Sequence, residues 1–214
     1  MMQAESVVQA IHEGFRWSTY PGDRWLQGSF EGCEPYDEVG PFEGRTDWSA
    51  IDPEFLDGHY CALGFFSEAG FRFFIPAYMV ADLRDQLKTA DPTFHLTHGF
   101  SDHSYEERRD GRTLVHRWGR SKLVNPRRYG AISWEEHARR NLAVFTREEA
   151  QAIVAYLRYK QGLEQTREVG EDQTIEAALQ LFWLERARVA PTAEDLTRQI
   201  EEERQLLRGA EGQA

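Results

Sequence analysis

Apolar residues recur at helical spacing in three well-separated segments of the chain, residues 3–16, 145–159 and 174–189. The apolar positions are Val7, Val8, Ile11 and Phe15 in the first segment, Ala150, Ile153, Val154 and Leu157 in the second, and Ile175, Ala178, Leu179, Phe182 and Trp183 in the third. A repeat of three to four residues places such side chains on one face of an α-helix. The pattern predicts a mainly α protein, a single-domain helical bundle.

The most apolar stretch, FFSEAGFRFFIPAYMVADL at residues 65–83, predicts the central helix of this bundle. Its apolar side chains lie on nearly all sides of a helical wheel, which is typical of a buried helix. We expect this core helix over about 67–88, capped by Ser67. Pro76 lacks an N–H, so we expect a kink or a break there. Arg72 needs an acidic partner in such surroundings, and Asp23, Asp47 and Asp52 are the candidates.

Capping signals place the remaining helices. Asp52 and Pro53 predict the start of a short helix that ends near Leu63. Capping-box spacing precedes three later helices, at Ser133 and Glu136, Thr146 and Glu149, and Thr192 and Asp195. The last helix, about 193–208, carries few apolar residues and is expected to be exposed or to pack on a partner. We therefore divide the chain into a helical domain, 1–165, and a C-terminal helical extension, 166–214, packed on it or exposed.

Two segments break the helical pattern. Residues 17–50 contain five Gly, three Pro and seven aromatic residues. The aromatic content argues against disorder, so we expect a long ordered loop wrapped on the helices. Residues 91–130 form an irregular basic insertion, in which TLVHRW at 113–118 predicts a short strand.

Composition limits the surroundings in which the protein works. In 214 residues no apolar run reaches the length of a membrane span, because Glu68, Arg72 and Asp82 interrupt the best candidate. The N-terminal residues do not resemble a signal peptide. Without a secretory signal, Cys33 and Cys61 are expected to be reduced, as inert thiols or small buried apolar residues. These features predict a cytoplasmic protein with no membrane partner.

The formal net charge of −11 argues against a nucleic-acid partner, since phosphate contacts need clustered Lys and Arg. The sign reverses in residues 91–130, which hold eight basic and five acidic residues, all eight basic ones within 108–128. Interleaving with Trp118 and Tyr129 resembles a nucleic-acid surface. In an acidic chain, however, we expect these cations to pair with acidic segments of the same molecule.

Catalytic motifs are absent from the sequence. It has no G-x-S-x-G, no phosphate-binding P-loop and no H-E-x-x-H. The spacing of His95, His98 and His103 matches no zinc motif, so we expect these histidines to be solvated loop residues. The sequence therefore predicts no cofactor, no metal and no catalytic residues.

The acidic, aromatic segment 17–50 is the best candidate for a recognition surface, with seven acidic and two basic residues. Tryptophan among carboxylates suits a basic protein partner, although the same aromatic residues could instead pack on the helices. The candidate binding residues are Asp23, Trp25, Asp47, Trp48 and Arg72. The first hypothesis is a non-catalytic protein-interaction module, for instance of the immunity or toxin-neutralising type. The alternative is an enzyme or small-ligand-binding protein with a site between residues 20–48 and Arg72. The oligomeric state is open.

Four motifs resemble a family of uncharacterised bacterial proteins. They are YPGD at 20–23, FEGRTDW at 42–48, FFSEAGFRFFIPAYM at 65–79 and FTREEAQAIVAYLRY at 145–159. The resemblance extends in pieces over about residues 5–160, and the 65–79 segment is its most specific part, with Gly70 inserted in the usual pattern. Because this family is a domain of unknown function, the resemblance implies no reaction and no site residues.

Overall fold

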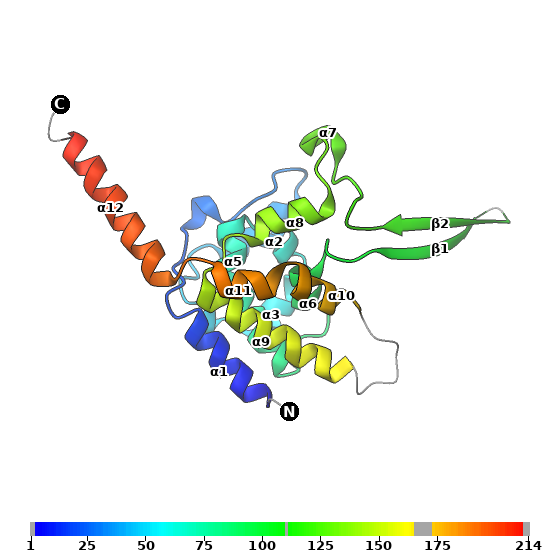
Figure 1. Cartoon of the computed structure of the whole chain (residues 1–214), viewed down its shortest axis with the longest axis horizontal. Helices are drawn as coiled ribbons and strands as arrows, with labels where there is room; N and C mark the ends of the chain where they lie inside the picture. The colour runs from blue at the N-terminus through cyan, green and yellow to red at the C-terminus, as the bar shows by residue number, and fades with distance from the viewer. Residues whose placement is uncertain (1–2, 110, 165–172, 212–214) are drawn as a thin grey trace.

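The computed structural model describes residues 3–109, 111–164 and 173–211, and it shows a mainly α protein with one β-hairpin (Figure 1). The elements, in chain order, are α1 (Ala4–Gly14), η1 (Asp23–Trp25), α2 (Glu34–Val39), η2 (Gly40–Phe42), η3 (Trp48–Ala50), α3 (Pro53–Gly58), α4 (Ala62–Phe65), α5 (Glu68–Leu83), α6 (Pro92–Thr97), β1 (His103–Arg109), β2 (Arg112–Trp118), α7 (Pro126–Tyr129), α8 (Trp134–Leu142), α9 (Arg147–Glu164), α10 (Gln173–Ala178), η4 (Leu179–Trp183), α11 (Leu184–Val189) and α12 (Ala193–Glu211). The predicted helical bundle in a single domain is confirmed.

Helix α5 is the centre of the core, as its apolar residues predict. Ser67 caps it by accepting a hydrogen bond from the backbone N–H of Gly70 at 3.0 Å. The helix buries Phe71, Phe73, Phe74, Ile75, Tyr78 and Met79 among others. It is continuous through Pro76, so the predicted alternative of a break is wrong. A proline inside a helix costs about 3 kcal/mol, and burying one large apolar side chain contributes about 1.5–3 kcal/mol, so the packing of this helix outweighs the missing hydrogen bond.

Helices α1 and α9 pack side by side against α5. The predicted stripe of α1 is confirmed, because Val7, Val8, Ile11 and Phe15 are all buried. Gly14 permits the close contact with α9: a Cβ atom at this position would lie 2.8 Å from the carbonyl oxygen of Glu148. The side chains of α1 and α9 therefore enter the same core as those of α5.

The predicted helix at 174–189 is present, but its middle turn is a π-helix, η4, between α10 and α11. Its predicted apolar residues, among them Ile175 and Trp183, are buried in the same core as α5. The indole N–H of Trp183 donates to the carbonyl oxygen of Leu96 at 2.8 Å. A single turn of π-helix re-aims the side chains that follow it, and here it accompanies the burial of a large tryptophan.

The predicted capping boxes are all formed. Ser133 and Glu136 cap each other's backbone at the start of α8. Glu149 accepts from the backbone N–H of Thr146 at 2.8 Å, and Asp195 accepts from that of Thr192 at 3.1 Å. Each box satisfies N–H groups that a helix leaves unpaired at its N-terminus.

Residues 17–50 are ordered, as predicted, but they contain short helices that the sequence pattern does not show. These are η1, α2, η2 and η3. The predicted helix after Asp52 is likewise split, into α3 and α4. Within 17–50, Phe42 and Trp48 are buried, whereas Trp17, Trp25, Phe30 and Tyr36 are more than half exposed. The segment thus contributes both to the core and to the surface.

Residues 91–130 are more regular than predicted. The strand expected at 113–118 is present as β2, and β1 pairs with it antiparallel from His103 opposite Trp118 to Arg109 opposite Arg112. Helix α6 precedes the hairpin and α7 follows it. Two cations of this segment form ion pairs with acidic residues elsewhere in the chain, Arg128 with Glu31 and Arg120 with Glu135. The expected pairing within the molecule is confirmed for these two.

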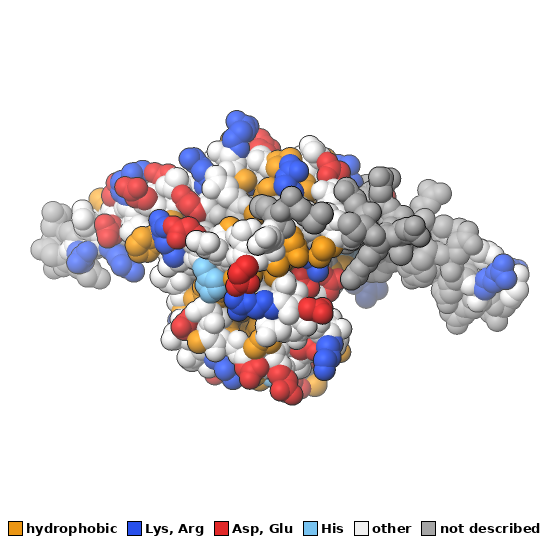
Figure 2. All heavy atoms as spheres, turned by 90° about the horizontal axis from the view of Figure 1, so that it is seen from below, with side chains coloured by type: hydrophobic (Ala, Val, Ile, Leu, Met, Phe, Trp, Pro, Cys, Tyr) orange, Lys and Arg blue, Asp and Glu red, His pale blue; other side chains and the backbone are white. Residues whose placement is uncertain are grey.

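The hairpin and α12 extend from the helical body in different directions (Figure 1). Helix α12 adds no described residue to the core, and its Ile200 and Leu206 are exposed. On the face drawn in Figure 2, acidic and basic side chains are intermixed over the body between these two arms. Among the described residues, no helix is both long and apolar enough to cross a membrane.

Candidate functional site

Asp23 holds residues 20–44 together. Its carboxylate accepts a hydrogen bond from the hydroxyl of Tyr20 and another from the backbone N–H of Gly44 at 2.9 Å. These bonds, the one from Tyr20 first, lower the pKa of Asp23, and burial together with the Asp23 contact raises the pKa of Tyr20 to about 12. The Tyr20 ring packs edge-on against Phe73 of α5. Asp23 therefore lies on the surface but serves to close the loop.

Trp25 has an exposed side chain on a fixed backbone. Its indole is 59% exposed, and the guanidinium of Arg24 lies 5.1 Å from the ring centroid. Its carbonyl oxygen accepts from the hydroxyl of Ser67, and the next residue, Leu26, is buried. A large apolar side chain on an immobilised backbone loses little entropy when it binds.

Asp47 and Trp48, also candidate binding residues, have structural contacts. Asp47 caps η3 by accepting from the backbone N–H and the hydroxyl of Ser49, at 2.9 and 2.7 Å. Trp48 is only 8% exposed and stacks on His12, with 5.0 Å between the ring centroids. Trp48 thus lies in the core, and its indole is far less exposed to solvent than that of Trp25.

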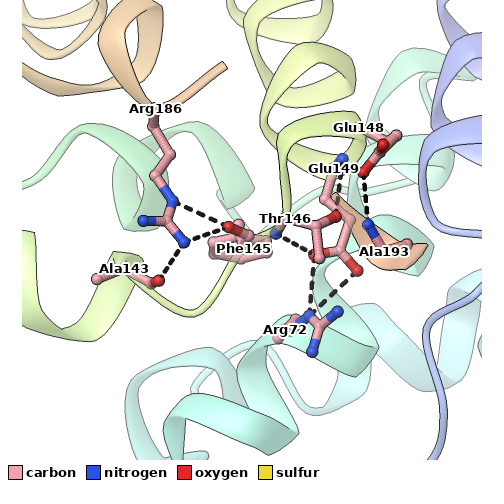
Figure 3. Close-up of polar contacts among 8 residues, drawn as sticks. All are labelled: Arg72, Ala143, Phe145, Thr146, Glu148, Glu149, Arg186 and Ala193. Atoms are coloured by element: carbon pink, nitrogen blue, oxygen red, sulfur yellow. Dashed lines mark hydrogen bonds and ion pairs between the residues drawn. The ribbon is translucent and has the colours of Figure 1, made fainter. Parts of the chain in front are cut away.

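Arg72 pairs with Glu149, and the three partners considered from the sequence are wrong. Its Nε lies 2.9 and 3.1 Å from the two carboxylate oxygens of Glu149, on the N-terminal turn of α9 (Figure 3). Asp23 and Asp47 are engaged in their own loops, and Asp52 caps α3 by accepting from the backbone N–H of Glu54 at 2.9 Å. The capping box of Thr146 and Glu149 could have identified this partner from the sequence, because it places the carboxylate of Glu149 at the start of a buried helix.

A second guanidinium completes this network. Arg186 donates to the carbonyl oxygens of Ala143 and Phe145, in the connection between α8 and α9 (Figure 3). Burial lowers the pKa of Arg186. Both oxygens of Glu149 contact Arg72, and one also accepts from the backbone N–H of Thr146. The network connects three helices, and both oxygens of Glu149 are engaged in it.

The histidines differ from their expected solvated loops. His95 lies on α6 against Phe71 and Phe94, and burial lowers its pKa to about 4. His98 stacks on Phe94 at 4.6 Å between centroids. The side chain of His103 lies outside the described residues. No group of three or more His, Cys, Asp or Glu among the described residues is placed to hold a metal ion.

Another candidate surface is formed by α2, the residues just before it and the turn before α4. Here Phe30, Tyr36 and Tyr60 are 63%, 52% and 46% exposed. We call these three residues, together with Glu34 and Glu38, the aromatic–acidic surface. Phe30 and Tyr36 meet edge to face, with 6.3 Å between their centroids.

The two carboxylates of this surface act on the hydroxyl of Tyr60 through their charge. A hydrogen bond with Cys61 raises the pKa of Tyr60, and the negative charges of Glu38 and Glu34 raise it further. One carboxylate oxygen of Glu38, Oε2, is buried and has no hydrogen-bond partner within the described part of the chain. Buried polar atoms are nearly always hydrogen-bonded, so this unsatisfied oxygen is an exception.

Sequence reasoning missed this surface because Tyr60 lies outside segment 17–50. The composition gave one usable signal: residues 28–40 contain four acidic residues and no basic one, with Phe30 and Tyr36 among them. Both cysteines are near it in sequence and both are free. Cys61 is half-buried, whereas Cys33 is exposed, so of the two alternatives for Cys33 the buried apolar residue is wrong and the inert thiol stays a prediction.

Comparison with known proteins identifies one relationship. The model of a family of unknown function (DUF6714) matches residues 28–187. Neither the curated proteins nor the solved structures contain a match. The matched range begins just before α2 and ends within α11, so it includes the aromatic–acidic surface and the Arg72–Glu149 pair.

Proposed function

The chain belongs to the DUF6714 family, whose function is unknown, and we propose from its own surface that it is a cytoplasmic, non-catalytic interaction protein for a basic protein partner. The partner contacts the aromatic–acidic surface, with Trp25 as a further exposed aromatic of the same segment. A basic toxin neutralised by an immunity-type protein is an example of such a pair. The observation that carries the proposal is the grouping of three exposed aromatic rings with two carboxylates.

The chemistry of the surface fits a cationic partner. Exposed Trp and Tyr residues are enriched among the residues that dominate protein–protein binding energy. The face of an aromatic ring attracts Lys and Arg side chains, by about 0.5–1 kcal/mol at exposed sites. Glu34 and Glu38 add negative charge next to the rings, which speeds the approach of a basic protein.

Glu38 supports the same partner chemistry. Its negative charge acts on Tyr60 together with that of Glu34, so a cation of the partner is attracted there. Its Oε2 atom is buried and has no hydrogen-bond partner among the described residues, so the partner acts on Glu38 through charge and not through a hydrogen bond to this oxygen. The alternative function, an enzyme or ligand site at Arg72, has less support, because Arg72 and Glu149 already satisfy each other.

The experiment begins with affinity capture by the full chain from its native host. The captured protein is identified, purified and titrated against the wild type and variants. We expect a basic protein, and we expect Phe30→Ala, Tyr36→Ala and Glu34→Lys each to weaken its binding by about tenfold or more. The effect of Glu34→Lys should shrink at high salt.

Matched controls lie on α11, away from this surface. Val189→Ala removes an apolar side chain that is 52% exposed, and Glu185→Lys reverses an exposed charge. Both should bind like the wild type. A partner with an acidic surface, or binding that the surface and control variants weaken equally, contradicts the proposal.

A further inference from the structure

A groove lies between the C-terminal half of α1, the first turns of α9 and the first half of α12. Its volume is about 930 Å³. It is open because α12 projects away from the helical body after its first turns (Figure 1). It shares no lining residue with the aromatic–acidic surface, so it is a separate site.

Small residues line the side of the groove that α1 and α9 form. Gly14 and Ala152 are both buried, and Ala10 lies one turn before Gly14. At Gly14 a Cβ atom would lie 2.9 Å from the Cβ of Ala152. The two helices therefore touch through their backbones here and leave a trough between α1 and α12. Trp17, which is 64% exposed, also lines the groove and supplies a large aromatic contact.

The groove carries an excess of negative charge. Four glutamates line it, Glu13, Glu148, Glu194 and Glu201, against two arginines, Arg16 and Arg198. Both arginines are already paired with carboxylates, Arg16 with Glu13 and Arg198 with Asp195. Glu194 and Glu201 are exposed and seven residues apart, which places them on one face of α12.

The base of α12 is fixed, although the helix projects. Glu148 of α9 accepts a hydrogen bond from the backbone N–H of Ala193 at 3.0 Å (Figure 3). Ile200 lies seven residues after Ala193 on the same line of α12 and is 39% exposed. The acidic wall of the groove thus has an apolar edge next to it.

We propose that this groove binds an amphipathic α-helix of a partner protein, with lysines or arginines along its polar side. An amphipathic helix in a groove between helices is a recurring recognition mode, and its diameter of about 10–12 Å suits a trough of this kind. Its apolar side contacts Trp17, Ala152 and the edge at Ile200, and its cations face Glu194 and Glu201.

The negative charge of α1 and α12 argues against a second copy of this chain as the helix that occupies the groove. Helix α12 contains six acidic and three basic residues, and α1 contains two acidic residues and neither lysine nor arginine. Placing either helix of another copy in the groove brings like charges together. Opposite charges across an interface favour association, and like charges disfavour it.

The test uses the designed amphipathic peptide LKKLLKLLKKLLKL with a fluorescent label, titrated with the full chain by anisotropy. A scrambled peptide of the same composition is the control for charge alone. We expect the amphipathic peptide to bind at least about tenfold more tightly than the scrambled one. Glu201→Lys, in the groove, should weaken its binding about tenfold, and Glu203→Lys, an exposed residue on the opposite face of α12, by no more than about twofold.

A second pair of variants tests shape without changing charge. Thr197→Trp fills the groove and should abolish binding, whereas Gln199→Trp on the far side of α12 should not. Circular dichroism confirms that each variant is folded. Equal binding of both peptides, equal loss in Glu201→Lys and Glu203→Lys, or no saturable binding overturns the proposal. So does a dimer in sedimentation that Thr197→Trp dissociates, because the occupant is then a second copy. None of these outcomes bears on the aromatic–acidic surface.

Discussion

Glu149 contacts the guanidinium Nε of Arg72 with both carboxylate oxygens, at 2.9 and 3.1 Å, and the same carboxylate caps the first turn of α9. The pair joins residues 77 positions apart. The Glu149 side chain is only 2% exposed and that of Arg72 is 22% exposed. One carboxylate therefore caps the start of α9 and neutralises the charge of Arg72 on the buried helix α5.

Removing one member of this pair leaves an uncompensated charge in the interior. Arg72→Leu should lower the free energy of unfolding by about 3–5 kcal/mol, measured by urea denaturation. The double variant Arg72→Leu/Glu149→Gln should be more stable than the sum of the two single changes predicts. If the losses of the two single variants simply add up in the double variant, the two side chains do not stabilise each other.

The core position of Phe74 predicts a large loss when its ring is removed. Phe74 is fully buried, so Phe74→Ala should cost about 3–5 kcal/mol of unfolding free energy. Phe94 is the matched control, because its ring is 49% exposed; Phe94→Ala should cost about 1 kcal/mol or less. Chemical denaturation of both variants decides the point, and similar losses would contradict the assignment of α5 as the core.

Trp25 and Trp48 belong to one segment but should respond in opposite ways. Trp48 is buried against His12 and Phe15, so Trp48→Ala should cost about 3–5 kcal/mol. Trp25 is mostly exposed, so Trp25→Ala should change stability by about 0.5 kcal/mol or less and weaken only partner binding. Thermal melts separate the two, and a large drop in Tm for Trp25→Ala would place its indole in the core.

The contact between Asp23 and Tyr20 predicts a dependence of stability on pH. The folded pKa of Asp23 is lowered, so its stabilising contribution is present above its unfolded pKa of about 3.9 and is lost as the pH falls through the folded pKa. The pKa of Tyr20 is raised to about 12, so its contribution is present below about pH 10 and is lost as the pH rises through 12.

Urea unfolding across the acidic range, comparing the wild type with Asp23→Asn, measures the first effect. The difference between the two proteins should shrink as the pH falls below about 4. A difference that stays constant with pH would mean that the carboxylate of Asp23 does not stabilise the fold through its charge. The tyrosine absorbance at alkaline pH reports the second effect. The part that titrates above the usual pKa of about 10 should fall by one tyrosine in Tyr20→Phe and not vanish, because Tyr60, Tyr78 and Tyr156 also have raised pKa values.

Helix positions were readable from the sequence because their signals are local. Caps lie within three residues of a helix start, as Ser67 and the Thr146–Glu149 box illustrate, and apolar side chains on one face lie three or four residues apart. The stripe of Val7, Val8, Ile11 and Phe15 and the buried α5 follow from these short-range rules. Strand β1 lacks such a pattern, since its residues are mostly polar. Helix α6 carries the same local signal as α3, because Asp91 caps it just before Pro92, and this signal went unrecognised.

The candidate sites depended on tertiary structure. Trp25 and Trp48 stand in similar sequence surroundings, yet one is exposed and the other packs on His12, because burial depends on which distant element covers a side chain. The partner of Arg72 lies on α9, and the charges of Glu34 and Glu38 reach Tyr60 because α2 packs on α4. The sequence by itself determined where the longer helices, such as α5, α8, α9 and α12, begin and which faces of α1 and α5 are apolar. The fold decided which acidic and aromatic residues share a surface, since that requires residues far apart in the chain to meet.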